Sequence, residues 1–175
     1  MQEKTDSAYK ILVVDDDQNT CLLTKTELTR RGCIVETAND GLDAICKIFH
    51  FEPHIVILDV WMPGLEGKDL VKTVKAYRNQ VGIFMVSASK NEKTKEECLL
   101  KGAYAYFEKP VDIDLLYNKI KEFFEQEKIS PPPSLSEYDL QEVEMVLKLL
   151  EKKGLMARNE VLGEFTKLRK QNSPS

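Results

Sequence analysis

The sequence has no apolar run that approaches the roughly 18 residues of a membrane span. Its first residues, MQEKTDSAYK, are polar and lack the apolar stretch of a signal peptide. An excess of basic charge is also missing, because the formal net charge is -4 and the isoelectric point is near 5.4. A general nucleic-acid binder is usually basic. We therefore expect a cytoplasmic protein without a membrane partner, and we do not expect nucleic acid to be its main ligand.

Residue pairs at the spacing of a metal or disulfide site are missing too. The chain has four cysteines, none of them in a CxxC pair and each in or beside an apolar segment: Cys21, Cys33, Cys46 and Cys98. This pattern predicts reduced, half-buried thiols. His50 and His54 are four residues apart, as in a helical metal pair, but Pro53 lies between them and breaks a helix. We expect no ligand role for these histidines.

What the chain does have is a regular alternation of short apolar runs and amphipathic helical stretches between residues 9 and 127. The strand-like runs are 11–14, 33–37, 55–58, 82–86 and 103–107, and the helical stretches are 19–31, 41–51, 66–77, 92–101 and 112 onward. Five repeats of strand then helix predict right-handed crossovers and a parallel sheet that helices cover on both faces. A chain of 175 residues is long enough for this α/β domain and a smaller segment after it.

Helical spacing also predicts which side chains face the core. Gly32 is expected to end the first helix in a C-cap role. The apolar positions expected to pack against the sheet are Leu22, Leu23, Leu28, Leu42, Ile45, Ile48, Phe49, Leu70, Val71, Val74, Leu115, Leu116, Ile120, Phe123 and Phe124.

The composition changes after residue 127. Residues 128–136 contain three consecutive prolines and predict a stiff, extended linker. Residues 137–170 predict a helical hairpin, and we expect residues 1–8 and 171–175 to be disordered. Two amphipathic helices cannot bury both apolar faces alone, so the hairpin docks on the domain, pairs with a second copy or binds another protein. We favour dimerisation or protein interaction.

A competing hypothesis makes the same hairpin the output segment of a transcriptional or RNA-binding regulator. Basic side chains for such contacts are Arg158, Lys167, Arg169 and Lys170. Acidic residues nearly balance the basic ones in this segment, and a charge-balanced hairpin is a weak match to a recognition helix.

Polar side chains stand where the predicted strands end. Asp15 and Asp16 follow the first run, Asp59 the third, and Ser87 and Lys109 the fourth and fifth. Taken singly, each has a plainer interpretation, such as a turn or capping residue for Asp59 or a solvated lysine for Lys109. In a parallel sheet, however, these ends share one rim. Three carboxylates there would repel one another without a cation such as Mg²⁺, and a hydroxyl with an ammonium beside them suggests phosphate.

The segments ILVVDDD, VILDVWMPGLEG, MVSAS and AYFEKP resemble the defining motifs of the receiver (CheY-like) domain of two-component response regulators. The resemblance covers roughly residues 9 to 127. It implies a flavodoxin-like, doubly wound five-stranded parallel sheet with strand order 2-1-3-4-5, here followed by the C-terminal helical hairpin.

The resemblance also implies roles for single residues. Asp59 matches the aspartate that accepts a phosphoryl group from a histidine kinase or a histidine phosphotransfer protein. The residues that match the Mg²⁺ ligands are Asp15, Asp16, Asp59 and the backbone carbonyl of Trp61. Ser87 and Lys109 match the residues that contact the phosphoryl group, and Ser87 and Tyr106 match the switch pair. The peptide bond before Pro110 matches a cis bond of the family. Tyr106 alone would be read as an ordinary half-buried strand residue.

The expected activity is signalling, with self-catalysed phosphorylation and dephosphorylation and no turnover of external substrates. A metal-dependent phosphatase that uses Asp59 is the alternative, but the sequence shows neither a second acid placed as a general acid nor a substrate-binding cap. Trp61, two residues after Asp59, adds one hypothesis. Its bulky indole would shield an acyl phosphate from water and slow the loss of the phosphoryl group.

Overall fold

The computed structural model describes residues 9–63, 67–77 and 80–127. In chain order the elements are β1 Lys10–Val14, α1 Gln18–Arg30, β2 Ile34–Ala38, α2 Gly41–Phe51, β3 Ile55–Asp59, α3 Gly67–Tyr77, β4 Gly82–Ser87, α4 Glu92–Leu100, β5 Ala105–Glu108 and α5 Ile113–Glu127. Among these helices, none has the length and hydropathy that a membrane span requires. The predicted linker, hairpin and terminal segments lie outside the described residues.

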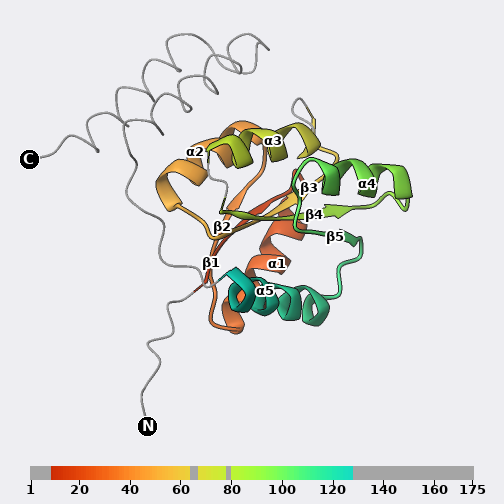
Figure 1. Cartoon of the computed structure of the whole chain (residues 1–175). Coiled ribbons are helices and arrows are strands. Elements are labelled where there is room, and N and C mark those ends of the chain that lie inside the picture. The colour runs from red at the N-terminus through yellow and green to blue at the C-terminus, as the bar shows by residue number, and fades with distance from the viewer. Residues whose placement is uncertain (1–8, 64–66, 78–79, 128–175) are drawn as a thin grey trace, which may run out of the picture.

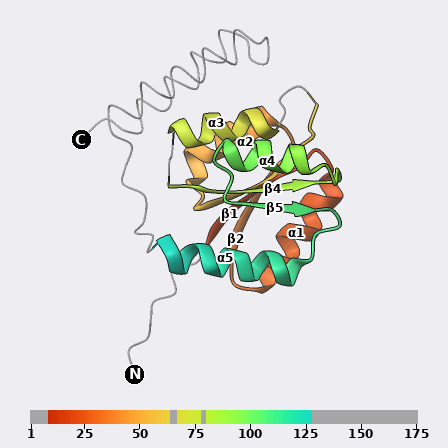
Figure 2. The same ribbon diagram turned by 45° about the vertical axis from the view of Figure 1, so that its right-hand side comes forward.

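The strands form one parallel sheet in the order β2-β1-β3-β4-β5. Helices α1 and α5 cover one face, and α2, α3 and α4 cover the other (Figures 1 and 2). This confirms the predicted flavodoxin-like architecture. Because all five strands run in the same direction, their carboxyl ends open on one rim, where ligands of doubly wound sheets bind.

Two apolar layers hold the helices on the sheet. Every residue of β3 and of β4 is buried, as expected for central parallel strands that helices cover on both sides. Leu12, Val56 and Ile83 pack in the layer under α2 and α3, while Ile11, Ile57 and Phe84 pack in the layer under α1 and α5. Alternate residues of each strand therefore supply opposite layers.

The helix ends follow the sequence signals. The carboxylate of Asp17 accepts a hydrogen bond from the Asn19 N–H and caps α1, and that of Asp40 accepts one from the Asp43 N–H and caps α2. Gly32 has φ +87°, the left-handed conformation that a C-cap glycine adopts at little steric cost, so its predicted role is confirmed. The strand boundaries differ from the predictions by one or two residues. The clearest differences are in β2, which is shifted to Ile34–Ala38, and in β5, which starts only at Ala105.

Three of the predicted core positions are wrong. Leu22 and Leu23 in α1 are 64% and 63% exposed, and Leu115 in α5 is 59% exposed. The face of α1 that meets the sheet consists instead of Cys21, Thr24 and Leu28. These three positions follow the i, i+3, i+7 spacing of one helix face. Leu22 and Leu23 were predicted there because they are apolar, but Thr24 next to them is the residue that is buried.

The other predicted core residues are buried or partly buried, with Leu42 and Phe124 in the second group. The four cysteines are free thiols, and all except Cys46 are buried more deeply than predicted. Burial raises the pKa of Cys21 and of Cys33 to about 11. The Nδ1 atom of His54 accepts a hydrogen bond from the Lys10 N–H at 3.1 Å, so this histidine joins the start of β1 to that of β3.

Gly82, the first residue of β4, leaves room for an aromatic ring. A Cβ atom at this position would lie 2.8–3.0 Å from the ring of Phe123, a buried residue of α5. We predict that Gly82→Ala destabilises the protein by about 1–3 kcal/mol, because the core must shift to admit the methyl group. Urea unfolding measures the change.

A matched double mutant tests the cause. In a Phe123→Leu background, which removes the ring, the additional cost of Gly82→Ala should be much smaller. Equal costs in the two backgrounds would mean that the ring is not what excludes a larger side chain.

Candidate functional site

The side chains singled out at the strand ends meet at one rim of the sheet. Asp59 is the last residue of β3 and Ser87 the last of β4, while Asp15 directly follows β1 and Lys109 directly follows β5. The pairing of the parallel strands brings these ends together, since β3 lies between β1 and β4 and Ser87 is opposite Glu108.

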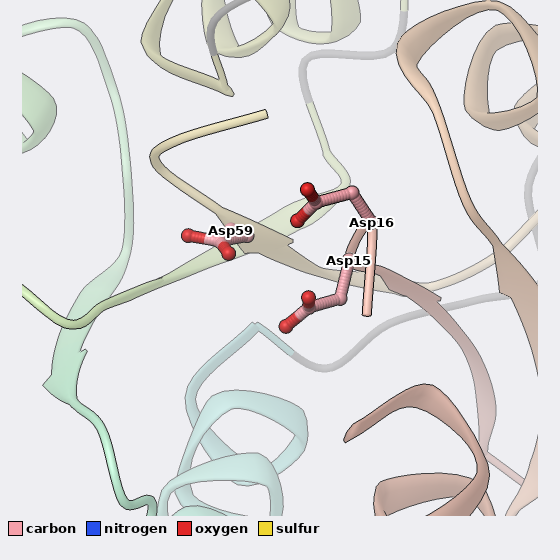
Figure 3. Close-up of side chains that lie close together, drawn as sticks. All are labelled: Asp15, Asp16 and Asp59. Atoms are coloured by element: carbon pink, nitrogen blue, oxygen red, sulfur yellow. The ribbon is translucent and has the colours of Figure 1, made fainter. Parts of the chain in front are cut away.

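Three carboxylates gather at this rim. One oxygen from each of Asp15, Asp16 and Asp59 lies within 4.8 Å of the other two. Figure 3 shows Asp59 on β3 and the Asp15–Asp16 pair beyond the end of the neighbouring strand. Asp15 and Asp59 are only 3% and 6% exposed, whereas Asp16 faces solvent. Two buried like charges this close need a counter-charge.

Lys109 supplies that counter-charge. Its Nζ atom lies 2.7 Å from Oδ2 of Asp15 and 2.7 Å from Oδ2 of Asp59. Partial burial disfavours the ammonium ion, but the two hydrogen bonds outweigh this effect and raise the pKa of Lys109. The lysine is therefore a fixed cation between two buried anions.

Backbone N–H groups hold the second oxygen of each buried carboxylate. The Asp17 N–H donates to Oδ1 of Asp15 at 2.9 Å, and the Trp61 N–H donates to Oδ1 of Asp59 at 3.1 Å. Each carboxylate is thus oriented from two sides by a lysine and a peptide group. Such orientation prepares a carboxylate for a reaction or for metal binding.

Gly67, the first residue of α3, permits a close backbone approach to Asp59. A Cβ atom built there would collide with the carbonyl oxygen of Asp59 and would lie 3.0 Å from its carbonyl carbon. The Gly67 N–H also donates to the Val60 carbonyl oxygen at 3.0 Å. The start of α3 therefore lies against the end of the strand that carries Asp59, a close approach that a glycine permits.

Two residues that the sequence reasoning missed support Asp15. The side-chain amide of Asn39 donates to the Asp15 carbonyl oxygen at 3.2 Å, and the Cys21 thiol donates to the same oxygen at 3.4 Å. Asn39 directly follows β2, so its position on the rim was a detectable signal. No comparable signal marked Cys21, because a buried thiol in a helix is usually a packing residue.

Ser87 and Tyr106 are connected through the backbone of Ser89. The buried Ser87 hydroxyl accepts a hydrogen bond from the Ser89 N–H at 3.1 Å, and the Tyr106 hydroxyl donates to the Ser89 carbonyl oxygen at 3.1 Å. The ring of Tyr106 is partly buried against the layer under α2 and α3. A displacement of the Ser87 hydroxyl would therefore reach Tyr106 through the backbone of a single residue, Ser89.

The donor set fits a hard divalent cation. Mg²⁺ prefers oxygen ligands and usually takes one or two carboxylates in addition to water and phosphate oxygens. Asp15, Asp16 and Asp59 offer such oxygens, and one ammonium group leaves the cluster with excess negative charge. The peptide of Trp61 lies beside Asp59 through its N–H, while a ligand role for its carbonyl oxygen stays a prediction.

The comparisons with known proteins agree with this geometry. The model of the response regulator receiver domain family matches residues 11–121, more than half of the chain. The chain belongs to this family. Response regulators receive phosphate from histidine kinases, and receiver domains generally use Mg²⁺ at an acidic pocket such as the one formed by the three aspartates.

Individual relatives show how far the likeness extends. The alkaline phosphatase synthesis transcriptional regulatory protein PhoP of Bacillus subtilis is 32% identical over 138 residues, which are 79% of this chain and 58% of PhoP. Protein PilG of Pseudomonas aeruginosa is 32% identical over 124 residues and is covered to 90% of its length. The CheY-like receiver domain protein from Methanospirillum hungatei has a TM-score of 0.67 and 30% identity, over 70% of this chain and 98% of that protein.

The receiver site allows a prediction about Lys109. In buffer without divalent cations, Lys109→Met leaves two buried carboxylates without their counter-charge and should lower the free energy of unfolding by about 3 kcal/mol or more. Lys119→Met is the matched control, because Lys119 pairs with Glu122 at the surface, where ion pairs contribute little. Denaturant unfolding compares the two variants, and equal effects would contradict a special role for Lys109.

Wild type and Lys109→Met can also be compared across a range of pH. Because the pKa of Lys109 is raised above 10.5, the folded protein holds this proton more tightly than the unfolded chain does. The stability advantage of wild type over Lys109→Met should therefore be complete at neutral pH and disappear as the pH rises through the raised pKa. Cys33 ionises in both proteins and cancels in the comparison, whereas Lys109 lowers the pKa of Cys21, so this thiol ionises at a higher pH in Lys109→Met. An advantage that persists unchanged in strong alkali would contradict the ion-pair explanation.

Proposed function

We propose that this receiver accepts a phosphoryl group on Asp59 in a Mg²⁺-dependent reaction and thereby switches the surface around β4 and β5. The observation that carries the proposal is the setting of Asp59. It is a buried carboxylate at a strand end that Lys109 and the Trp61 N–H orient and that faces Asp15 and Asp16. The phosphoryl donor is a histidine kinase or a histidine phosphotransfer protein.

In the reaction an oxygen of Asp59 bonds to phosphorus while the P–N bond of the phosphohistidine breaks, and the imidazole leaves with the electron pair. The Asp59 side chain is held by two donors, so attack requires little reorientation. Lys109 already faces Asp59 at 2.7 Å and offsets the charge of the incoming phosphoryl group. Asp15 and Asp16, with Asp59, would hold Mg²⁺, which supplies electrostatic stabilisation of phosphoryl oxygens when bound.

The switch involves groups on β4 and β5, which lie on the opposite side of β3 from β1. Phosphorylation adds about -1.5 to -2 charge and three acceptor oxygens. The Ser87 hydroxyl, at the end of the neighbouring strand, donates to one of these oxygens and gives up its present bond with the Ser89 N–H. Since the Tyr106 hydroxyl is bonded to the Ser89 carbonyl oxygen, its ring reorients when the backbone of Ser89 moves. The outcome is a shift between two existing conformations.

We further propose that the protein is not an enzyme for external substrates, and that its output is dimerisation or protein contact through residues 137–170. This hairpin lies outside the described residues, so the proposal rests on its sequence pattern. The name of PhoP identifies that relative as a transcriptional regulator, and a nucleic-acid output is the alternative. A gel-shift assay across salt concentrations distinguishes the two, because phosphate contacts weaken steeply with salt.

The central prediction concerns labelling of Asp59. A small acyl phosphate or phosphoramidate should phosphorylate the wild-type protein in Mg²⁺, and the label should disappear in Asp59→Ala and when the metal is chelated. Phosphate-affinity electrophoresis and intact mass measure the product. Asp43→Ala, which removes a carboxylate from the surface of α2, is the control and should label normally. A label retained by Asp59→Ala would exclude this residue as the acceptor.

Trp61 is expected to lengthen the lifetime of the phosphoryl group. The residue is 49% exposed, and its backbone N–H donates a hydrogen bond to Asp59. The indole therefore extends from a residue that lies directly beside the phosphoacceptor. Trp61→Asn should shorten the lifetime several-fold by admitting water, whereas Trp61→Phe keeps an apolar ring and should remain close to wild type. Decay of the isolated phosphoprotein measures the rate. Equal lifetimes for all three proteins would exclude shielding by the indole.

A further inference from the structure

A small cavity lies beneath the carboxylates on the face of the sheet that α1 and α5 cover. Its volume is about 20 Å³. Asp15 and Asp59 line it at the rim, and most of the remaining wall is apolar, with Val13 and Ile57 from the sheet and Leu116 from α5. On the α1 side the wall includes Thr24. Packed side chains therefore do not fill all of the space beneath the carboxylates.

Thr24 has an unexplained hydroxyl group. The residue is 9% exposed and occupies the sheet-facing side of α1. Within the described parts of the chain, no group forms a hydrogen bond with this hydroxyl. Two other threonines of the same helix differ, since the Thr20 hydroxyl donates to Oδ2 of Asp17 and the Thr26 hydroxyl donates to the Leu22 carbonyl oxygen, each at 2.8 Å. Buried polar groups are rarely left without a partner.

The carboxylates have acceptor capacity to spare. Each oxygen of an ionised carboxylate accepts about two hydrogen bonds. In Asp15 and Asp59, Oδ2 accepts one from Lys109, and Oδ1 accepts one from a backbone N–H. The cavity thus joins a buried hydroxyl that needs a partner to two anions that can accept further bonds.

Size and chemistry select the ligand. A cavity needs at least about 10–15 Å³ to hold a water molecule, so this one has room for a single water. A second divalent cation would require about six oxygen ligands, and the apolar wall cannot provide them. A water can accept one hydrogen bond and donate two, which matches a hydroxyl on one side and two carboxylates on the other.

We propose that this cavity binds one water molecule that links the Thr24 hydroxyl to the carboxylates of Asp15 and Asp59. Through this water, Thr24 acts as a positioning residue for the phosphoacceptor. It supports the carboxylate from the side opposite the rim, in addition to the support from Lys109 and the Trp61 N–H. The positioning role rests on the proposed phosphorylation of Asp59, whereas the water site itself does not.

The water site is tested without any phosphorylation. A high-resolution crystal structure of the wild-type chain should show ordered density within hydrogen-bond distance of Thr24 Oγ1 and of at least one of the two carboxylates. Thr24→Ser keeps the hydroxyl and should keep the density, while the isosteric Thr24→Val should lose it. A wild-type cavity without density, or density unchanged in Thr24→Val, would overturn the proposal.

Thermal unfolding provides an independent measure. If the hydroxyl were unpaired, Thr24→Val would raise Tm by removing an unsatisfied polar group. If water bridges it to the carboxylates, the variant loses hydrogen bonds, and Tm should fall by about 2–4 °C. An unchanged or higher Tm contradicts the proposal. Thr26→Val is the control, because it makes the same substitution on the exposed side of α1, away from the cavity.

Labelling then separates the positioning role from the proposed function. With Mg²⁺ at saturation, the phosphorylation rate of Thr24→Val should fall about tenfold, the equivalent of one hydrogen bond, while Thr24→Ser and Thr26→Val stay within about twofold of wild type. A wild-type rate in a Thr24→Val variant that has lost the water would exclude the positioning role. A wild-type protein that takes no label at all would instead contradict the proposed function, and the crystallographic result would stand apart from it.

Discussion

The two salt bridges from Lys109 to Asp15 and Asp59 are the interaction on which the rest of this site depends. Parallel strands deliver their carboxyl ends to one rim, and the chain places acids on two neighbouring strands there. Both acids are buried, so their repulsion is not screened by water, and a cation held at 2.7 Å from each is what makes the arrangement stable. The lysine comes from the far end of the domain sequence and joins β1, β3 and β5 in one electrostatic unit.

That unit connects to the rest of the fold through backbone contacts. Asn39, directly after β2, and Cys21 of α1 hold the Asp15 carbonyl oxygen, and Gly67 allows the start of α3 to lie against the backbone of Asp59. On the other side, Ser87 and Tyr106 meet at the two polar groups of Ser89. Ser87, at the end of the strand next to Asp59, is therefore joined to Tyr106 of β5 by two hydrogen bonds to the backbone of Ser89, and the proposed switch would use this connection.

The errors of the sequence-based prediction share one cause. Leu22, Leu23 and Leu115 were assigned to the core because they are apolar and lie at helical spacing, yet all three face solvent. An amphipathic pattern indicates that a helix has a buried side, but the rotation of the helix about its axis is fixed by the strands beneath it. In α1 the sheet selects Cys21, Thr24 and Leu28, and this choice places Thr24 in the wall of the cavity under the acids.

By itself, the sequence determined the order of elements, the parallel sheet and the identity of the groups at its rim. These follow from local features: continuous apolar runs for central strands, glycines and capping residues at the helix ends, and polar side chains where each strand stops. Only the tertiary structure decided that Lys109 binds two carboxylates, that Ser89 joins Ser87 to Tyr106, and that Thr24 faces the cavity beneath Asp59. Such contacts join residues far apart in the chain or depend on how a helix is rotated about its axis. The spacing of residues along one segment specifies neither the long-range contact nor the rotation.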